Sequence, residues 1–217
     1  MTEILLIRHG ETAWNAVRKL QGHLDIPLNA EGCRQAKALA AGLQQEKLAA
    51  IISSDLQRAM QTAGEIARLQ GLPTHIDAAL RERCFGDFEG KLYSELPEIY
   101  PEEYAHWRLR DPDFHFPAKL DDANNIGESI REFQQRTVDC IEIYAKQFTG
   151  QKIALVAHGG VLECAYRAAM NLPLDAERTI TIFNASINRF SYQDGRLSLI
   201  SWGDIGHLGD AMLDELN

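Results

Sequence analysis

Two short apolar runs that each end in a histidine stand out in the pattern of hydrophobic and polar positions along the chain. Residues 4–7 (ILLI) precede Arg8 and His9, and residues 153–157 (IALVA) precede His158. Unbroken aliphatic runs of this length are typical of strands that are buried on both faces of a parallel sheet. Open α/β sheets bind ligands at the carboxyl ends of such strands, so we expect both histidines to face one crevice.

Segments with helical spacing of apolar residues alternate with these runs. We expect helices over residues 29–43, from 56 to about 71 with residues 53–55 (SSD) as its cap, from 128 to 150, and over 161–170. Further strands are expected over residues 48–52, 73–77 and 178–183, before a hairpin with its turn at Asp194 and Gly195. This alternation predicts an α/β fold, a three-layer αβα sandwich with a mainly parallel central sheet, an antiparallel edge and a small helical cap insertion.

A change in composition marks the insertion, at about residues 91–125. Prolines interrupt this segment at four positions and aromatic residues are dense in it, which predicts short helices and loops that lie over the crevice. The chain has 217 residues, and about 150 residues is an ordinary domain length. We therefore expect a single domain over residues 1–217 that carries the insertion as a cap. Whether the cap also selects the substrate stays open.

The charge balance restricts the class of protein. The chain has 22 basic and 31 acidic side chains and a net charge of −9. This argues against nucleic acid as a partner, because nucleic-acid binders need a broad basic surface, and an anionic ligand would need a local basic pocket. No stretch approaches the roughly 18 apolar residues of a membrane span, and no signal-peptide pattern begins the chain. We expect a cytoplasmic protein without a membrane partner, and leave open whether it forms a homodimer.

The four cysteines are scattered and form no CxxC pair, which is typical of reduced thiols in cytosolic proteins. We expect Cys33, Cys140 and Cys164 to pack in the core. Cys84 lies close in sequence to the acidic residue Glu82, so a reactive role competes there with simple packing.

Several sequence motifs in a fixed order resemble the signature of one family. The motifs are RHGET at residues 8–12 with Trp14 and Asn15 after it, QGHLDIPL at 21–28, SSDLQRAMQTA at 53–63, the acidic loop 82–90 and HGG at 158–160. This set resembles the histidine phosphatase superfamily, the phosphoglycerate-mutase-like proteins. The resemblance spans nearly the whole chain and is weakest over residues 91–125.

Phosphoryl transfer needs a nucleophile, cationic donors for the phosphoryl oxygens and a proton source for the leaving group. The resemblance implies that His9 attacks phosphorus and becomes a phosphohistidine. It also implies that Arg8, Arg58 and His158 bind the three equatorial oxygens. Glu82 is implied to protonate the leaving alkoxide and then to deprotonate the attacking water, for which it must carry a proton near neutrality.

Three further residues complete the expected site. Asn15 and Gln21 lie in loops that resemble those of the family, where amide donors contact phosphoryl oxygens. Gly159 adds a backbone N–H at the start of a helix. No HExxH or similar ligand spacing is present, so we expect neither a metal nor another cofactor.

The two motif histidines have opposite requirements. His9 attacks only through an unprotonated nitrogen, so we expect a backbone carbonyl to hold its other nitrogen as a donor and three neighbouring cations to keep the ring neutral. His158 binds phosphate best as an imidazolium, so the pKa values of the two rings should differ. The remaining histidines are expected to be structural: His23, His75, His106, His115 and His207.

We expect a phosphomonoesterase that acts on a small phosphorylated metabolite and is similar to α-ribazole phosphatases and broad-specificity phosphatases. The alternative is a cofactor-dependent phosphoglycerate mutase, in which a second hydroxyl group takes the phosphoryl group. Acids outnumber bases in the insertion, where only Lys91, Arg108, Arg110 and Lys119 are basic, and this favours a monophosphate over a bisphosphate. A third alternative is an inactive relative that only binds a phosphorylated ligand, against which the complete set of motif residues argues.

Overall fold

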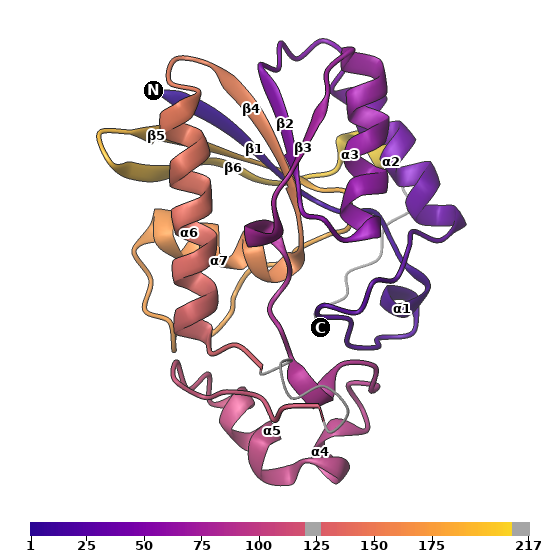
Figure 1. The fold of residues 1–217 in the computed structure, drawn as a ribbon, viewed down its shortest axis with the longest axis vertical. Coiled ribbons are helices and arrows are strands. Elements are labelled where there is room, and N and C mark those ends of the chain that lie inside the picture. Colours follow the sequence, from indigo (N-terminus) through magenta and orange to yellow (C-terminus); the bar gives the residue numbers. More distant parts are fainter. Residues whose placement is uncertain (120–126, 210–217) are drawn as a thin grey trace.

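The computed structural model describes residues 1–119 and 127–209. Within these residues one six-stranded sheet has the strand order β3-β2-β4-β1-β5-β6 (Figure 1). The strands are β1 (Thr2–Arg8), β2 (Ala50–Ser53), β3 (Thr74–Ile76), β4 (Lys152–Ala157), β5 (Ile187–Gln193) and β6 (Arg196–Asp204). Strands β3, β2, β4 and β1 run parallel, whereas β5 and β6 pair antiparallel. The predicted sheet, mainly parallel with an antiparallel edge, is confirmed.

Helices cover both faces of this sheet. One face packs against α2 (Ala30–Gly42) and α3 (Gln57–Gln70), and the other packs against α6 (Ile130–Gln147) and α7 (Gly159–Met170) (Figure 1). The three-layer αβα sandwich is therefore also confirmed. Three short 3₁₀ helices occur in the described residues: Ala78–Leu80, Gly86–Phe88 and Gly206–Leu208.

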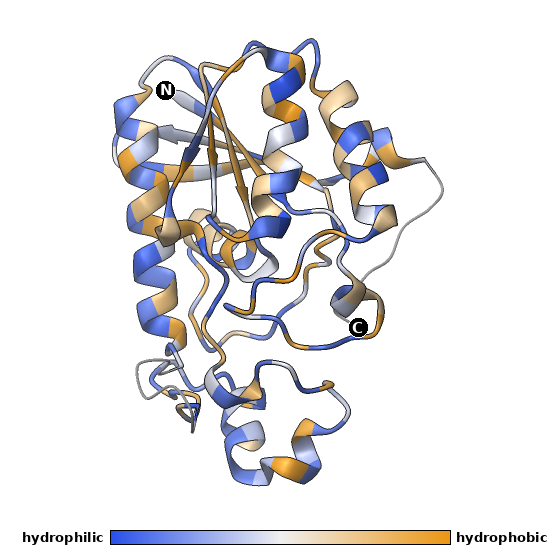
Figure 2. Ribbon diagram, turned by 45° about the vertical axis from the view of Figure 1, so that its right-hand side comes forward, coloured by the Kyte–Doolittle hydropathy of each residue, from blue (hydrophilic) through white to orange (hydrophobic). Residues whose placement is uncertain are grey.

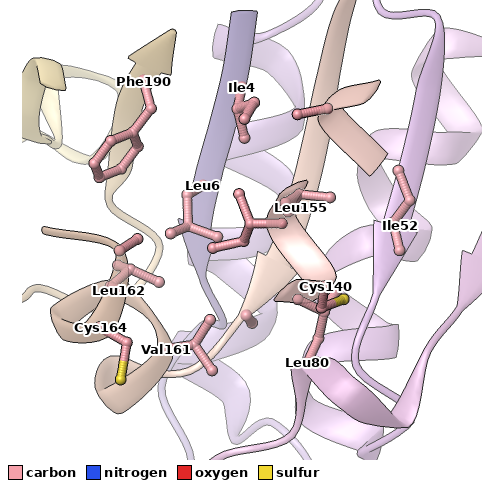
Figure 3. Close-up of a cluster of buried hydrophobic side chains, with 14 of the residues drawn as sticks. Ile4, Leu6, Ile52, Leu80, Cys140, Leu155, Val161, Leu162, Cys164 and Phe190 are labelled. Atoms are coloured by element: carbon pink, nitrogen blue, oxygen red, sulfur yellow. The ribbon is translucent and has the colours of Figure 1, made fainter. Parts of the chain in front are cut away.

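The apolar run in β1 supplies side chains to both cores. Ile4 and Leu6 join the cluster under α6 and α7, whereas Leu5 and Ile7 join the cluster under α2 and α3. This follows because successive side chains of a strand point to opposite faces. Figure 2 shows the central strands coloured mainly for hydrophobic residues, and Figure 3 shows side chains of β1, β4 and α7 pointing toward one another in the first cluster. Each such side chain contributes about 1.5–3 kcal/mol when it is fully buried.

Local sequence signals set most helix ends. Asn29 caps α2 by accepting a hydrogen bond from the backbone N–H of Gly32. Ser129 and Glu132 form a capping box at the start of α6. Gly71 ends α3 with a φ of 65°, which is a left-handed conformation that favours glycine.

The start of α3 differs from the expectation. Its N-cap residue is Leu56, which makes no side-chain cap, so the predicted cap by residues 53–55 is wrong. Asp25, from a loop distant in sequence, accepts the backbone N–H of Gln57 at 2.7 Å instead. A tertiary contact thus takes the role that a local side chain was expected to have.

The expected strand over residues 178–183 is also wrong. The chain crosses from α7 to β5 through an irregular segment, residues 171–186, and β5 occupies the position beside β1. Residues 178–181 line the cavity described below, whereas Ile182 is buried. The alternating pattern of this segment therefore reflects a cavity wall and not a sheet.

The insertion packs as a small aromatic unit. It contains α4 (Leu96–Ile99) and α5 (Pro101–Arg108), and its side chains gather around the buried residues Leu20, Phe88, Leu96 and Phe116. Figure 1 shows α4 and α5 beyond the carboxyl ends of the parallel strands, with α1 (Ala13–Ala16) at the same end of the molecule. The part of the predicted insertion at 120–126 lies outside the described residues. None of the helices in residues 1–119 and 127–209 is long and apolar enough to cross a membrane.

The cysteines are buried except for one. Cys140 and Cys164 lie in the core as expected, but Cys33 is exposed, because the buried side of α2 is formed by residues 32, 35, 36, 39 and 40. Cys84 is buried, and burial raises the pKa of its thiol to about 11. A thiolate is therefore disfavoured at Cys84, which supports the packing interpretation.

Candidate active site

The register between β1 and β4 brings the two motif histidines together. The strands pair in parallel with Arg8 opposite Ala157, so the next residues, His9 and His158, leave the sheet side by side. Both side chains are buried, and their ring centroids are 5.1 Å apart. The two histidines therefore lie together at the carboxyl ends of β1 and β4, as the sequence predicts.

The His9 ring is held in one tautomer. Its Nδ1 lies 2.7 Å from the carbonyl oxygen of Gly10, which can only accept, so Nδ1 carries the hydrogen and Nε2 is left with a lone pair. Burial lowers the pKa of His9 well below its ordinary value, and the charges of Arg58 and Arg8 lower it further. The expected backbone carbonyl is confirmed, although burial outweighs the neighbouring cations in keeping the ring neutral.

His158 is held by a serine. Its Nε2 lies 2.8 Å from the hydroxyl oxygen of Ser54, and its Nδ1 is buried without a hydrogen-bond partner among the described residues. Burial lowers the pKa of His158 well below its ordinary value, as do the charges of Arg58 and His9. In the ligand-free protein the pKa values of both rings are therefore lowered, and the imidazolium form expected for His158 depends on a bound anion.

Two arginines converge on this site and are fixed by backbone carbonyls. Arg58, in the first turn of α3, donates to the carbonyl oxygens of Leu24 and Gly22, each at 2.8 Å. Burial lowers the pKa of Arg58 to about 10, so the guanidinium remains charged at neutral pH. Arg8 donates to the carbonyl oxygen of Ile182 at 2.6 Å. Donors held in this way need little reorganisation when an anion binds.

Glu82 points to the start of α7. Its two carboxylate oxygens accept the backbone N–H groups of Arg83 at 2.8 Å and Gly160 at 3.0 Å. A Cβ atom on Gly160 would lie 2.2 Å from Glu82 Oε1 and 2.8 Å from Phe133. Position 160 therefore accepts only glycine while Glu82 keeps its place. His23 Nε2 donates to the backbone carbonyl of Glu82 at 2.8 Å, which is a structural contact of the kind expected for this histidine.

The three further candidates also line the cavity. Asn15 Oδ1 accepts from the backbone N–H and the hydroxyl of Thr12, both at 2.9 Å, so the amide NH₂ of Asn15 is its remaining donor group. Gln21 is buried, and its Oε1 has no hydrogen-bond partner among the described residues. Gly159 is the first residue of α7, where backbone N–H groups lack helical partners.

These groups, except for His158, line a strongly basic cavity of about 610 Å³. His158 is fully buried beside His9 and is not among the lining residues. Among the described residues, nine arginine or lysine side chains and only three carboxylates line it, although the whole chain has a net charge of −9. The carboxylates are Glu82, Glu163 and Glu177. The basic residues are Arg8, Arg18, Lys19, Arg58, Arg83, Arg108, Arg110, Arg167 and Arg178. The local basic pocket that an anionic ligand needs is present.

The basic cavity contradicts the inference that the acidic insertion favours a monophosphate ligand. Of the nine basic residues only Arg108 and Arg110 belong to the insertion. The acidic composition of the insertion therefore says little about the cavity, and the preference for a monophosphate over a bisphosphate does not follow from it. What the insertion does contribute is an aromatic wall, formed by Tyr93, Tyr104 and Trp107.

Comparison with known sequences decides the family. A sequence model of the histidine phosphatase superfamily (branch 1) matches residues 4–205. The chain belongs to this superfamily. Among its relatives, phosphoglycerate mutase-like protein 4 of Arabidopsis thaliana is 38% identical over 209 residues, which is 95% of this chain and 86% of that protein. The metal-independent phosphoserine phosphatase of Arabidopsis thaliana is 36% identical, over 96% of this chain and 84% of that protein.

Solved structures of two phosphatases have the same fold. The phosphoserine phosphatase of Entamoeba histolytica, in complex with 3-phosphoglyceric acid, superimposes with a TM-score of 0.81 and 28% identity, covering 96% of this chain and 100% of that chain. A putative α-ribazole-5′-P phosphatase from Escherichia coli superimposes with a TM-score of 0.78 and 27% identity, covering 94% and 98%. The predicted resemblance to this superfamily is confirmed.

Two residues that matter to this histidine phosphatase site were missed by sequence reasoning. Ser54, which holds His158, was interpreted as part of a helix cap. Glu89 is buried in the acidic loop, where its Oε1 accepts the backbone N–H groups of His23 at 2.8 Å and Phe85 at 3.1 Å. Its Oε2 accepts from Lys119 at 2.8 Å. Glu89 thus connects the loop after α1, the acidic loop and the insertion, and its motif position was the only signal for this role.

Proposed function

We propose that the protein is a phosphomonoesterase that hydrolyses a small phosphorylated metabolite through a phosphohistidine on His9. The observation that carries this proposal is the state of His9, a neutral ring whose Nδ1 is tied to Gly10 while Arg8, Arg58 and His158 lie around it. Phosphatases among its relatives and structural neighbours support the reaction class.

In the first step, Nε2 of His9 attacks phosphorus and the bond between phosphorus and the ester oxygen breaks. Protonated Glu82 gives its proton to the leaving alkoxide. Arg8, Arg58 and His158 bind the equatorial oxygens, and His158 does so through Nδ1, which has no hydrogen-bond partner in the part of the chain that the structure describes. Charge that develops on the phosphoryl oxygens is stabilised by these fixed donors.

In the second step, the Glu82 carboxylate takes a proton from a water molecule that attacks the phosphohistidine. The bond between phosphorus and Nε2 breaks, and inorganic phosphate and neutral His9 are released. Asn15, Gln21 and the backbone N–H of Gly159 would contribute further hydrogen bonds to the oxygens. Each step uses only groups of this chain and water, so we propose that catalysis needs neither a metal nor an organic cofactor and persists in the presence of a chelator.

The test is hydrolysis of p-nitrophenyl phosphate by the wild-type protein and by His9→Ala. We expect the variant to lose at least about 10⁴-fold in kcat, because it lacks the nucleophile. Rapid quenching of the wild-type reaction should give an acid-labile, base-stable phosphoryl label that His9→Ala lacks. His75→Gln is the matched control, because His75 is an exposed histidine on β3. The proposal would be refuted if the wild-type protein carried no phosphoryl label, or if His9→Ala had unchanged turnover.

A mutase is the second candidate, and two observations favour it. One relative is named phosphoglycerate mutase-like protein 4, and the basic cavity exceeds what one phosphoryl group requires. Conversion of 3-phosphoglycerate to 2-phosphoglycerate with added bisphosphoglycerate, faster than release of inorganic phosphate, would assign the mutase. Phosphate binding without either reaction would assign the inactive relative.

A further inference from the structure

A second group of charged residues lies in the same cavity, apart from the motif residues. Glu163, on α7, accepts hydrogen bonds from Arg110 at 2.6 Å and from Arg167 at 2.9 Å. Arg178 Nε lies 3.8 Å from its other carboxylate oxygen. All four residues line the cavity, and we refer to them as the arginine cluster. One carboxylate thus faces three guanidinium groups.

The three arginines differ in how many further hydrogen bonds the protein supplies to them. Arg110 donates from Nε to the carbonyl oxygen of Leu174 at 3.3 Å. Arg167 donates further hydrogen bonds to the carbonyl oxygens of Pro173 at 2.7 Å and Ala176 at 2.8 Å, so it holds the segment after α7 in place. Arg178 has two buried nitrogens, Nε and Nη2, without a hydrogen-bond partner among the described residues, and 22% of its side chain is exposed. A guanidinium that is largely removed from water and incompletely paired is costly, and an incoming anion relieves that cost.

Arg178 also lies within a short distance of the phosphoryl site. It precedes Ile182 by four residues, and the carbonyl of Ile182 anchors Arg8. Four residues span at most about 14 Å. Burial lowers the pKa of Arg178, whereas the negative charges of Glu163 and Glu82 act to raise it, so Arg178 is within electrostatic range of Glu82. Arg178 and the phosphoryl-site residues Arg8 and His9 also line one cavity of about 610 Å³, so a single small ligand in it can contact both regions.

We propose that Arg178, together with Arg110, binds a second oxyanion of the same metabolite whose phosphoryl group lies at His9. This rests on the proposed function and adds a substrate class, phosphomonoesters that carry a carboxylate or a second phosphate. The planar guanidinium fork matches both groups, because each presents two oxygens to parallel N–H donors. Glu163 positions the arginines without neutralising them.

The test compares pairs of substrates that differ in the second anion. 3-Phosphoglycerate and glycerol 3-phosphate differ by a carboxylate in place of a hydroxymethyl group. Fructose 1,6-bisphosphate and fructose 6-phosphate differ by a second phosphate. We expect the wild-type protein to prefer the more anionic member of at least one pair by tenfold or more in kcat/KM, and the preferred pair identifies the second anion.

Arg178→Gln should reduce that preference about 10- to 100-fold, because a hydrogen-bonded charge pair is lost. Arg178→Lys should retain part of it, since the charge remains but the fork does not. The matched control is Arg131→Gln, which removes one positive charge from an exposed ion pair with Asp113 outside the cavity and should leave both values of kcat/KM unchanged.

Equal kcat/KM within both pairs in the wild-type protein would overturn this inference, and so would an Arg178→Gln variant that keeps the wild-type preference. Neither result would contradict the proposed function if p-nitrophenyl phosphate is still hydrolysed through His9. Absence of that hydrolysis in the wild-type protein would instead remove the proposed function, so the two failures are distinguishable.

Discussion

The phosphoryl site and the arginine cluster share one cavity but are built in different ways. At the phosphoryl site, backbone groups fix the reactive side chains: Gly10 holds His9, Gly22 and Leu24 hold Arg58, and Gly160 holds Glu82. In the arginine cluster, long side chains share one carboxylate, and Arg178 is incompletely paired. Strand register can thus preorganise a reaction centre. Ligand selection, in contrast, can depend on side chains whose missing hydrogen-bond partners the ligand supplies.

Removing the proposed proton donor at the phosphoryl site should have the largest effect on activity. Glu82→Gln should reduce kcat for an alkyl phosphate such as glycerol 3-phosphate by about 10³-fold, since general acid–base catalysis contributes 10²–10⁴-fold. The loss for p-nitrophenyl phosphate should be smaller, because p-nitrophenolate leaves without a proton. Steady-state kinetics with both substrates measure the difference. An equal loss for the two leaving groups, or a pH profile that matches the wild-type profile, would show that Glu82 is not the acid.

Removing Glu89 should weaken the contacts between the loop after α1, the acidic loop and the insertion, and so destabilise the fold. Glu89→Ala leaves the ammonium group of Lys119 and two backbone N–H groups without their buried acceptor. We expect the free energy of unfolding to fall by about 3 kcal/mol, the lower end for breaking a buried ion pair. Urea unfolding measures it, with Glu98→Ala on the exposed side of α4 as control. Equal stability of the two variants would mean that Glu89 does not connect the segments.

A single methyl group at position 160 tests how much geometry the phosphoryl site requires. In Gly160→Ala the new Cβ would overlap Glu82 Oε1, and movement of the Glu82 side chain is the least costly response. We expect kcat to fall about 100-fold, because a misplacement of about 1 Å has that effect, while the fold is retained. Gly64→Ala is the matched control on α3, where a Cβ meets no atom within 4 Å and should stabilise the helix by about 0.5–1 kcal/mol. Comparable activity in the two variants would contradict the prediction.

The buried histidines should make the stability of the ligand-free protein depend on pH. Burial lowers the pKa values of His9 and His158 in the folded protein, whereas in the unfolded chain they are about 6.5. Below that pH the unfolded state binds more protons, so the free energy of unfolding should fall by about 2 kcal/mol between pH 6.5 and 5.5 for the two rings together. Urea unfolding at both values measures the change.

The control for this effect is the double variant His9→Gln/His158→Gln, which should lose most of the pH dependence. The exposed pair His75→Gln/His106→Gln should keep it. A pH dependence that survives in the first double variant would show that other groups cause it. Bound phosphate should weaken the effect in the wild-type protein, because an anion beside the rings favours their protonated forms.

The sequence predicted the phosphoryl site better than the rest of the cavity, and the reason is visible in particular residues. His9 and His158 follow apolar runs that must be buried strands, so the ends of those strands locate both rings. Arg178 lies in a segment whose alternation suggested a strand, and no local signal indicates that it reaches Glu163. Glu89 and Lys119 are 30 residues apart, and no local sequence pattern indicates that they form an ion pair.

By itself, the sequence determined the apolar strands, most helix ends, the mainly parallel sheet and the residues that leave its carboxyl edge, because periodicity and capping act over a few neighbouring positions. Only the tertiary structure decided the charge of the cavity, the lowered pKa of His158 in the ligand-free protein and the capping of α3 by Asp25. Those properties depend on burial and on distances between residues far apart in the chain. Solvent exclusion and electrostatic interaction act through space, so the order of residues does not record them.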